Sequence, residues 1–334
     1  MYIVTGGAGF IGSNLVEGLN KRGKDDILVV DELNDGSKIQ NLSDCRITDY
    51  LDKDEFLRNI EQSGLPLKTT AVFHMGACSN TMEENVQYVM QTNFEYSKKL
   101  LHACTDNNTP LIYASSAATY GAGTIFQETE EYEYPLNAYA FSKLLFDRYV
   151  RKFESELNTQ VVGLRYFNVY GPREHHKGSM SSMVYQMIRQ FEQFGRLRLF
   201  SGTSGFSNGE QRRDFISVDD IVRVNLFFLD RPQLGGIFNA GTGASRSFND
   251  AALAVINSYR SSMDKPPATL EDSVSEGLIE YFDMPAVLRK RYQSFTEADI
   301  TRLSNVGFPT EFYSLETGVS AYLAWLTKQS SCGM

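Results

Sequence analysis

The first half of the chain alternates short apolar runs with longer stretches of helical periodicity. The apolar runs are bounded by polar or turn-forming residues, as expected for strands that are buried on both faces of a sheet. They cover residues 2–5, 27–30, 71–74, 111–114 and 161–164, and the helical patterns cover 11–21, 54–62, 86–104 and 139–156. Because strands and helices that alternate are joined by right-handed crossovers, the pattern predicts a Rossmann-like, doubly wound parallel sheet in an α/β fold.

This alternation ends after residue 165. A segment rich in Gly and Ser covers residues 201–210, and a strand over 214–217 and a helix over 219–229 are predicted next. Helical patterns return over 297–304 and 316–328. We therefore expect a Rossmann domain over 1–170, to which 214–243 returns, and a smaller α/β substrate-binding domain over 171–213 and 244–334.

Composition excludes several classes of partner. The 334 residues carry a formal net charge of -9, which argues against nucleic acid or an anionic membrane as the main partner. No apolar run approaches the roughly 18 residues of a membrane-spanning helix, and the N-terminus leads directly into a strand, so a cytoplasmic protein is expected. The four cysteines are scattered without a C-x-x-C pair, which favours reduced thiols. Because the chain is acidic overall, an anionic ligand would need a local cluster of cations.

A glycine-rich motif follows the first predicted strand. Residues 5–12 read TGGAGFIG, which places Gly6, Gly9 and Gly12 in a G-x-x-G-x-x-G pattern that opens the first helix. Glycines let the backbone approach a pyrophosphate, and the helix N-terminus favours its negative charge. Asp31 ends the second strand about 20 residues further on, where a carboxylate can accept a hydrogen bond from a ribose hydroxyl. The sequence therefore predicts a dinucleotide site.

These residues alone leave the choice between NAD and NADP open. Asp31 alone favours NAD, because a carboxylate would repel the 2′-phosphate of NADP. Lys38 and Lys53 follow in the same neighbourhood and could neutralise such a phosphate, unless they are solvated surface lysines.

A second group of candidate residues lies at the end of the fourth predicted strand and in the helix that follows it. Ser116 follows the strand predicted over 111–114 within the segment ASSAATYG (114–121) and so lies at the carboxyl edge of the sheet, where ligands bind. Tyr139 and Lys143 form a Y-x-x-x-K pair on one face of a predicted helix. A tyrosine with a pKa of about 10 is a poor base at neutral pH unless a nearby cation favours its phenolate, and Lys143 supplies that cation. The spacing alone is common on solvated helix faces, but after a glycine motif and a serine-ended strand it indicates a catalytic pair.

These three features together resemble the extended short-chain dehydrogenase/reductase family. Further segments are similar to its ADP-L-glycero-D-manno-heptose 6-epimerases, namely HMGACS (74–79), YASSAATYG (113–121), GLRYFNVYGPREHHKGSM (163–180), RRDFISVDD (212–220), IFNAGTG (237–243) and RYQSFTEADI (291–300). The resemblance covers nearly the whole chain. It implies an NADP-dependent isomerase of lipopolysaccharide inner-core synthesis that inverts C6 of the heptose and assembles as a homo-oligomer, a pentamer.

The resemblance also implies roles for individual residues. Tyr139 would be the catalytic acid/base, Lys143 would bind the nicotinamide ribose, and Ser116 would hydrogen-bond the substrate hydroxyl. Cofactor contacts are implied for Gly6, Gly9, Phe10, Ile11, Gly12, Asp31, Glu32, Lys38, Lys53, Met75, Gly76, Ala77, Cys78, Ser79, Asn93, Lys143, Val169 and Lys177. Substrate contacts are implied for Ser116, Asn168, Ser179, Phe200, Ser201, Gly202, Thr203, Arg213 and Tyr292. Arg213 suits a diphosphate because a guanidinium fork matches phosphate oxygens.

The basic stretch PREHHKGSM (172–180) has several interpretations. Inverting an unactivated carbinol requires hydride removal from one face and hydride return to the other, which a bound nicotinamide can perform without net consumption. The ketone must be presented twice, so a second acid/base is useful, and the resemblance assigns this role to Lys177. The alternative is a lysine that binds diphosphate or faces solvent. A metal site is disfavoured, because the adjacent His175 and His176 normally diverge and lack Cys or carboxylate partners at ligand spacing.

Some positions depart from the family pattern, and rival functions remain. Ala138, Ala140 and Phe141 alter the surroundings of the tyrosine, Met75 replaces a polar residue, and Gln186 stands where some members place a histidine that contacts substrate. A 4,6-dehydratase would need an Asp-Glu pair after the serine strand, where this chain has Ala117 and Ala118. A 4-epimerase remains a rival function, and so does a non-catalytic protein that senses dinucleotides, although such sensors typically lose Y-x-x-x-K.

Overall fold

The computed structural model describes residues 1–34, 36–203, 205–285 and 293–331. The chain forms two compact units. Unit 1 contains Met1–Tyr166, Ile221–Ala240 and Asp299–Pro309, and unit 2 contains Phe167–Asp220, Gly241–Ala298 and Thr310–Met334. This division differs from the expected one because 167–170, 214–220 and 241–243 belong to unit 2, whereas 299–309 returns to unit 1. The reason is local pairing: strand β7 (Asn168–Tyr170) pairs in parallel with β10 (Phe215–Ser217) in a small sheet of its own.

Unit 1 is built around a seven-stranded sheet in the order β11-β6-β5-β4-β1-β2-β3, and each neighbouring pair is parallel. The strands are β1 (Tyr2–Thr5), β2 (Ile27–Asp31), β3 (Asp49–Asp52), β4 (Ala71–His74), β5 (Leu111–Ser116), β6 (Val161–Tyr166) and β11 (Gly236–Ala240). The doubly wound prediction is therefore confirmed, together with its five predicted strands. The sequence pattern missed β3, a polar edge strand, and β11, which begins with a glycine and carries Asn239 in its apolar run.

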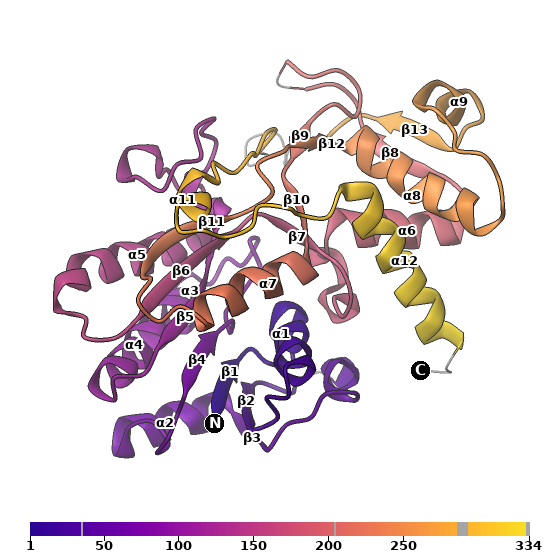
Figure 1. Cartoon of the computed structure of the whole chain (residues 1–334). Helices are drawn as coiled ribbons and strands as arrows, with labels where there is room; N and C mark the ends of the chain where they lie inside the picture. Colours follow the sequence, from indigo (N-terminus) through magenta and orange to yellow (C-terminus); the bar gives the residue numbers. More distant parts are fainter. Residues whose placement is uncertain (35, 204, 286–292, 332–334) are drawn as a thin grey trace. The chain divides into compact units, whose positions relative to one another are not determined.

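Helices cover this sheet (Figure 1). Side chains of α2 (Lys53–Ser63), α4 (Tyr96–Asp106) and α5 (Ala138–Phe153) form one buried apolar cluster with strand residues such as Ile3 and Val72. Helix α1 (Phe10–Lys21) packs closely on α7 (Val218–Leu229), since a Cβ atom added to Gly18 would lie 2.5 Å from a methyl carbon of Val222. Burial of such apolar surface is the main stabilising contribution to a core of this kind.

Two helix predictions need correction. The helix expected over 86–104 is interrupted, because α3 (Val86–Met90) and α4 are separated by a π-helical turn at Gln91–Glu95. The helix expected over 297–304 is confined to α11 (Thr301–Asn305), and the Asp299 carboxylate accepts a hydrogen bond from the Thr301 N–H just before it. No helix in the described ranges is both long and apolar enough to cross a bilayer.

Unit 2, in its described residues, combines three small sheets with four α-helices. Besides the β7–β10 pair, β8 (Leu197–Phe200) runs parallel to β13 (Ile279–Phe282), and β9 (Arg212–Arg213) runs antiparallel to β12 (Arg246–Ser247). The helices are α6 (Met183–Phe194), α8 (Phe248–Ser262), α9 (Leu270–Ser275) and α12 (Leu315–Ser331). The core lies where α6, α8 and α12 meet, around Val184, Val255 and Val319.

Candidate active site

The glycine-rich loop connects β1 to α1 in a conformation that requires glycine. Gly6 has φ +65, and a Cβ atom on it would lie 2.6 Å from the backbone nitrogen of Gly76. A Cβ atom on Gly12 would collide with the carbonyl oxygen of Gly6. Phe10 and Ile11 form the first turn of α1. The glycines therefore let the loop fold tightly against Gly76 and against itself directly before the N-terminus of α1, the arrangement that suits a pyrophosphate.

Asp31, at the end of β2, holds this loop in place. Its side chain is 6% exposed, and one carboxylate oxygen accepts a 2.8 Å hydrogen bond from the Ala8 N–H. The other oxygen accepts from the Glu32 N–H at 2.7 Å and from the Lys38 ammonium at 3.0 Å. Both oxygens thus have partners within unit 1, so Asp31 fixes the glycine loop in addition to its expected place beside a ribose.

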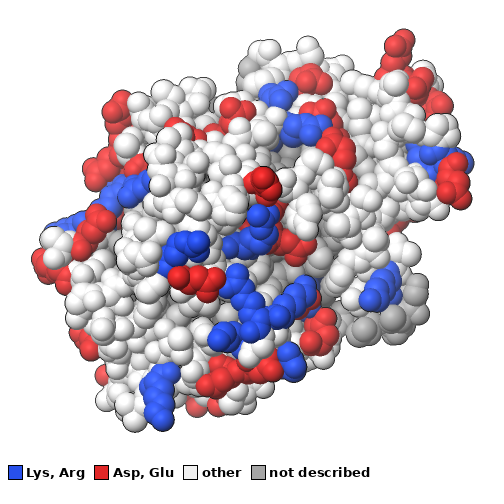
Figure 2. All heavy atoms as spheres, viewed as in Figure 1, with Lys and Arg blue, Asp and Glu red and all other residues white. Residues whose placement is uncertain are grey.

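Lys38 and Lys53 lie next to the same strand end. Lys38 bonds Asp31 and also the carbonyl oxygen of Glu32 at 3.1 Å, and the Lys53 ammonium lies 3.4 Å from the Glu32 carboxylate. Burial acts to lower the pKa of Lys53, but Asp54 and Glu32 raise it above its ordinary value. Lys53 is therefore a cation at neutral pH. Basic side chains also occur in groups beside acidic ones on the face shown in Figure 2, so cations gather locally although the net charge of the chain is -9.

A loop of five residues, Met75, Gly76, Ala77, Cys78 and Ser79, follows β4 and faces the glycine loop. The Met75 N–H donates to the Thr5 carbonyl at 3.0 Å. Asn93, 1% exposed in the π-helical turn, accepts from the Cys78 N–H at 2.8 Å and donates to the Cys78 carbonyl at 3.0 Å. Its amide also donates to the Ser142 hydroxyl on α5 at 3.0 Å. The buried Asn93 amide therefore connects the 75–79 loop to the helix that carries Tyr139. Asn93 lies in a π-helical turn, a feature that is frequent at functional sites.

Ser116, Tyr139 and Lys143 come together as the motif spacing predicts. The Ser116 hydroxyl accepts from the Ala118 N–H at 3.1 Å and hydrogen-bonds the Tyr139 hydroxyl. The Lys143 ammonium, whose residue is 5% exposed, donates to the Ala114 carbonyl at 2.7 Å. The end of β5 thus supplies two groups of the site: the Ser116 hydroxyl, which interacts with Tyr139, and the Ala114 carbonyl, which binds Lys143.

The protonation states in this group differ in part from the sequence-based expectation. Burial raises the pKa of Tyr139 above its ordinary value, against the opposing effect of its hydrogen bond with Ser116. Burial also lowers the pKa of Lys143 to about 8, although Asp147 and Cys78 act to raise it. The expected lowering of the Tyr139 pKa is therefore wrong for this arrangement, because desolvation outweighs the groups that favour the phenolate. At neutral pH Tyr139 is a neutral hydroxyl that can donate a proton.

The basic stretch 172–180 belongs to unit 2 and forms a loop that is closed by a buried carboxylate. Glu174 is fully buried and accepts hydrogen bonds from the Gly171 N–H at 3.2 Å and from the Ser182 hydroxyl at 2.8 Å. Lys177 lies on the short 3-10 helix His175–Met180, and its N–H donates to the Glu174 carbonyl at 3.0 Å. Burial lowers the pKa of Lys177, and Glu174 opposes this effect. An acid/base lysine needs a pKa that is lowered in this way, and sequence reasoning did not identify Glu174 as the carboxylate beside it.

The neighbouring histidines of this loop pack against each other. The rings of His175 and His176 are nearly perpendicular, with centroids 5.8 Å apart. Across the ranges that the structure describes, no cluster of three or more His, Cys, Asp or Glu residues could hold a metal ion.

Unit 2 contains a cavity of about 460 Å³, a size typical of small-molecule sites. Four of the predicted contacts line it: Asn168, Val169, Phe200 and Arg213. The predicted loop residues Ser201, Gly202 and Thr203 continue directly from Phe200, and the Ser201 N–H donates to the Phe282 carbonyl. Ser179 is exposed, and its carbonyl accepts from the Gln186 amide. Tyr292 lies outside the described residues.

The cavity also contains residues that sequence reasoning left out. Gln186, Gln190, Arg198 and Phe282 line it. The guanidinium carbon of Arg198 lies 4.6 Å from the centre of the Phe282 ring, and that ring lies 5.0 Å from the ring of Phe200. The β8–β13 pairing creates this group, and no local motif announces a pairing between residues more than eighty positions apart. The resulting surface combines aromatic faces with a cation and amides, as a nucleotide requires.

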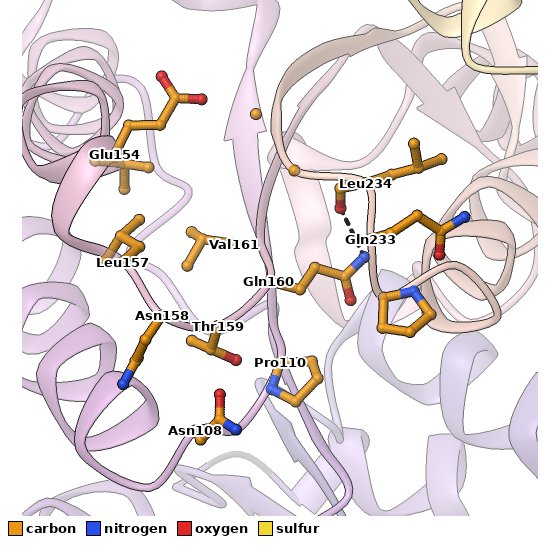
Figure 3. A pocket seen from close by; sticks show the side chains of 14 residues that line it. Asn108, Pro110, Glu154, Leu157, Asn158, Thr159, Gln160, Val161, Gln233 and Leu234 are labelled. Carbon is orange, nitrogen blue, oxygen red and sulfur yellow. Dashed lines mark hydrogen bonds between the residues drawn. The ribbon is translucent and has the colours of Figure 1, made fainter.

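A second cavity, of about 480 Å³, lies in unit 1 at the edge of the sheet where the strands begin (Figure 3). It is lined by Pro110, Gln160 and Gly236, which stand where β5, β6 and β11 begin. The Gln160 amide donates to three carbonyl oxygens, of Phe228, Arg231 and Leu234, and so closes the turn after α7. Because ligands of parallel α/β sheets bind at the carboxyl ends of the strands, this amino-terminal cavity is not the candidate site.

Comparison with known proteins places this geometry in a family. Residues 2–241 match the model of the NAD dependent epimerase/dehydratase family. The chain is 52% identical over 327 residues to the ADP-L-glycero-D-manno-heptose-6-epimerase of Cupriavidus pinatubonensis, with 98% of each chain covered. It is 50% identical over 328 residues to the enzyme of the same name from Pseudomonas aeruginosa strain UCBPP-PA14, covering 98% of this chain and 99% of that one.

Solved structures agree with the sequence matches. The ADP-L-glycero-D-manno-heptose-6-epimerase of Helicobacter pylori superposes with a TM-score of 0.78 at 30% identity, covering 98% of this chain and 96% of that one. A UDP-N-acetylglucosamine 4-epimerase from Methanobrevibacter ruminantium reaches the same TM-score at 25% identity and covers 98% of both chains. The chain therefore belongs to the NAD dependent epimerase/dehydratase family, the extended short-chain dehydrogenases/reductases, in which its full-length relatives are ADP-L-glycero-D-manno-heptose-6-epimerases.

Proposed function

We propose that this protein converts ADP-D-glycero-β-D-manno-heptose into ADP-L-glycero-β-D-manno-heptose for lipopolysaccharide inner-core synthesis. The observation that carries this proposal is the Ser116–Tyr139–Lys143 group at the carboxyl edge of the sheet, in a chain about half identical over its full length to enzymes of that name. The reaction inverts one carbinol carbon and leaves the oxidation state of the sugar unchanged.

The residues present fit a nicotinamide dinucleotide. Such a cofactor, when bound, supplies a site that accepts a hydride and later returns it. Gly6 and Gly12 let the loop pack backbone against backbone, where a Cβ atom would collide, and the loop leads directly into the N-terminus of α1, which favours a pyrophosphate. Lys143 is proposed to bind the nicotinamide ribose, and Asn93 ties the 75–79 loop to the same helix.

Tyr139 is proposed to move the proton of the carbinol oxygen. As the C6 hydride leaves, the hydroxyl proton of the substrate passes to the tyrosine oxygen, and the C6–O group becomes a ketone. Tyr139 therefore acts as a base in the first half of the reaction, which requires the phenolate, the minor form of this tyrosine at neutral pH because burial raises its pKa. The Ser116 hydrogen bond favours that form, and the positive charge of Lys143 would favour it too. Ser116 orients the oxygen that loses the proton.

Lys177 is proposed as the second acid/base. Hydride returns to the opposite face of the ketone, so the C6 oxygen occupies a different position in the second half of the reaction. A lysine with a pKa lowered by burial can donate a proton to that oxygen at neutral pH, and Glu174 holds its loop. Between turnovers Tyr139 releases the proton that it gained to solvent and Lys177 takes one up, which restores the proton balance.

The proposed activity is tested by incubating the purified protein with ADP-D-glycero-β-D-manno-heptose in D₂O. NMR is expected to show the L-glycero product without deuterium at C6, because the hydride that leaves is the one that returns. A product with deuterium at C6 would contradict hydride transfer. Turnover of UDP-glucose instead would favour a 4-epimerase, and dinucleotide binding without any turnover would favour a sensing protein.

NADP is the cofactor we propose, and the purified protein is expected to retain it. A cofactor that is regenerated in every turnover has no need to leave, and Lys38 offsets the Asp31 charge that would repel a 2′-phosphate. Denaturing the protein and identifying the released nucleotide by mass spectrometry checks this. Recovered NAD would overturn only the choice of cofactor, whereas a protein that binds neither dinucleotide would contradict the cofactor site.

Lys53→Met is expected to weaken NADP binding on the order of tenfold while leaving NAD binding close to normal. The reason is that a 2′-phosphate gains a charge-assisted hydrogen bond from Lys53, which the ribose hydroxyl of NAD does not need. Titration of the apoprotein with each dinucleotide measures the ratio. Lys24→Met, which removes an exposed lysine of the same unit, is the control. Equal losses for NAD and NADP would show that Lys53 does not recognise the phosphate.

A further inference from the structure

Helix α5 carries a buried carboxylate one turn after Lys143. Asp147 is fully buried, and its oxygens accept hydrogen bonds from the Tyr113 hydroxyl at 2.9 Å, the Ser115 hydroxyl at 2.8 Å and the Arg165 guanidinium at 2.9 Å. Burying a carboxylate is unfavourable unless it is paired and hydrogen-bonded, and here three donors satisfy it. The proposed reaction gives this carboxylate no part.

Asp147 belongs to a network of two buried carboxylates and their guanidinium partners. Arg165, which is fully buried, also pairs with Glu133, and Glu133 pairs with Arg151 at 2.7 Å. The more exposed Arg148 borders the network, 3.8 Å from Glu133. Asp147 and Glu133 thus share the partner Arg165 but occupy different positions. Substituting each carboxylate in turn therefore separates the effect of position from the effect of losing a partner of Arg165.

Only one of the two carboxylates is directly linked to the end of β5. Tyr113 and Ser115 project from the same side of the strand, because alternate residues share a face, and both bind Asp147. Between them, the Ala114 carbonyl accepts from Lys143. Lys143 and Asp147 are four residues apart and so lie on one face of α5. Two side chains of the helix therefore bind three successive residues of the strand that ends in Ser116.

We propose that Asp147 is a positioning residue for the reaction: it fixes α5 against the end of β5 and keeps the ammonium of Lys143 charged and in place. This inference rests on the proposed role of Lys143 in holding the nicotinamide ribose. Glu133 stabilises the same network without this action on Lys143.

Besides Tyr139, one turn earlier on α5, the titratable groups that face Lys143 come from three elements. His74 ends β4, Cys78 lies in the 75–79 loop, and Asp147 lies on α5. Burial, with Lys143 nearby, lowers the pKa of His74 to about 3, and burial raises the pKa of the Cys78 thiol, so both are neutral at neutral pH. Among these groups Asp147 is the carboxylate beside Lys143. Burial lowers the pKa of Lys143 to about 8, and Asp147 is the foremost group that opposes this.

The alkaline side of the activity profile depends on the charge of Lys143. Lys143 is charged below its pKa and neutral above it, so activity that needs the ammonium declines as the pH rises through that value. Asp147→Asn removes the neighbouring negative charge and moves the Lys143 pKa further down. The alkaline limb of the activity profile is therefore expected to move to lower pH by about one unit or more.

The test compares Asp147→Asn with Glu133→Gln in the full-length holoprotein. Each variant removes one carboxylate charge from Arg165, so the loss at that shared guanidinium is matched. The 13C resonance of the lysine Cε atoms, assigned with Lys143→Met, reports the Lys143 pKa without any need for activity. The pH dependence of kcat/KM for ADP-D-glycero-β-D-manno-heptose reports its consequence. We expect both readouts to shift in Asp147→Asn, and neither to shift by more than a few tenths of a unit in Glu133→Gln.

The outcomes separate a positioning role for Asp147 from a purely structural one. Equal shifts in the two variants, or an unchanged Lys143 pKa in Asp147→Asn, would overturn the inference and leave Asp147 a structural residue. A shifted Lys143 pKa in a protein that never turns over the heptose would overturn the proposed function alone. If Asp147→Asn fails to fold by circular dichroism, Asp147→Asn/Arg165→Met and Glu133→Gln/Arg165→Met carry the same comparison, because each removes one charge of each sign.

Discussion

Tyr139→Phe is expected to lose epimerase activity by about 10²–10⁴-fold while keeping its fold and its bound dinucleotide. The substitution keeps the ring in its partly buried place and removes only the oxygen that would exchange a proton with the substrate. Ser116 loses one hydrogen bond but still accepts from the Ala118 N–H, so the end of β5 should stay ordered. Steady-state kinetics, together with the amount of nucleotide released on denaturation, measure both parts of this result.

Tyr149→Phe is the matched control for this experiment. Tyr149 lies on the same helix, and its hydroxyl binds the ring nitrogen of His102 at 2.8 Å, away from the end of β5. This variant should turn over at close to the normal rate. Near-normal turnover in Tyr139→Phe would instead show that Tyr139 has a structural role, and equal losses in both variants would point to a general effect on α5.

The parts of the site that the sequence predicts are those built by one strand and the segment that follows it. The glycine loop, Ser116 and the Tyr139–Lys143 pair each belong to a short motif whose local geometry is fixed by helix or strand periodicity. Parallel strands all end at one edge of the sheet, so locating these motifs after strands was sufficient to bring them together. The seven-stranded sheet followed from the same alternation, except for polar β3 and for β11, which begins with a glycine.

The contacts that the sequence does not predict are made between distant segments. The motif predicts a ribose ligand at Asp31, yet one of its oxygens holds the Ala8 N–H and the other holds Lys38. Burial reverses the expected direction of the Tyr139 pKa, and burial is a property of the packed fold and not of the motif. The Arg198–Phe282 contact likewise depends on the pairing of β8 with β13. Periodicity gives the face on which a residue lies but not the partner it meets.

The two lysines of the proposed mechanism share one physical arrangement, although they belong to different units. Lys143 and Lys177 both have a pKa that burial lowers, and in each case a buried carboxylate nearby opposes the shift, Asp147 for the first and Glu174 for the second. For Lys143 this balance leaves a pKa of about 8, and for Lys177 it leaves a pKa below the ordinary value, the direction that proton transfer by a lysine requires. For Lys143 the charge itself is proposed to matter, whereas for Lys177 it is the exchange of a proton.

Lys177→Met is expected to lower kcat by about 10²-fold or more, with KM and NADP content little changed, if Lys177 transfers a proton. Methionine keeps a similar aliphatic length but can neither donate nor accept a proton. Lys177→Arg separates this role from simple attraction of the diphosphate, because arginine keeps the positive charge but holds its proton at any working pH. An acid/base lysine therefore predicts that both variants are inactive. A lysine that only binds diphosphate predicts a raised KM in Lys177→Met, a normal kcat, and substantial rescue by Lys177→Arg; that result would leave the 172–180 loop as a substrate-binding loop.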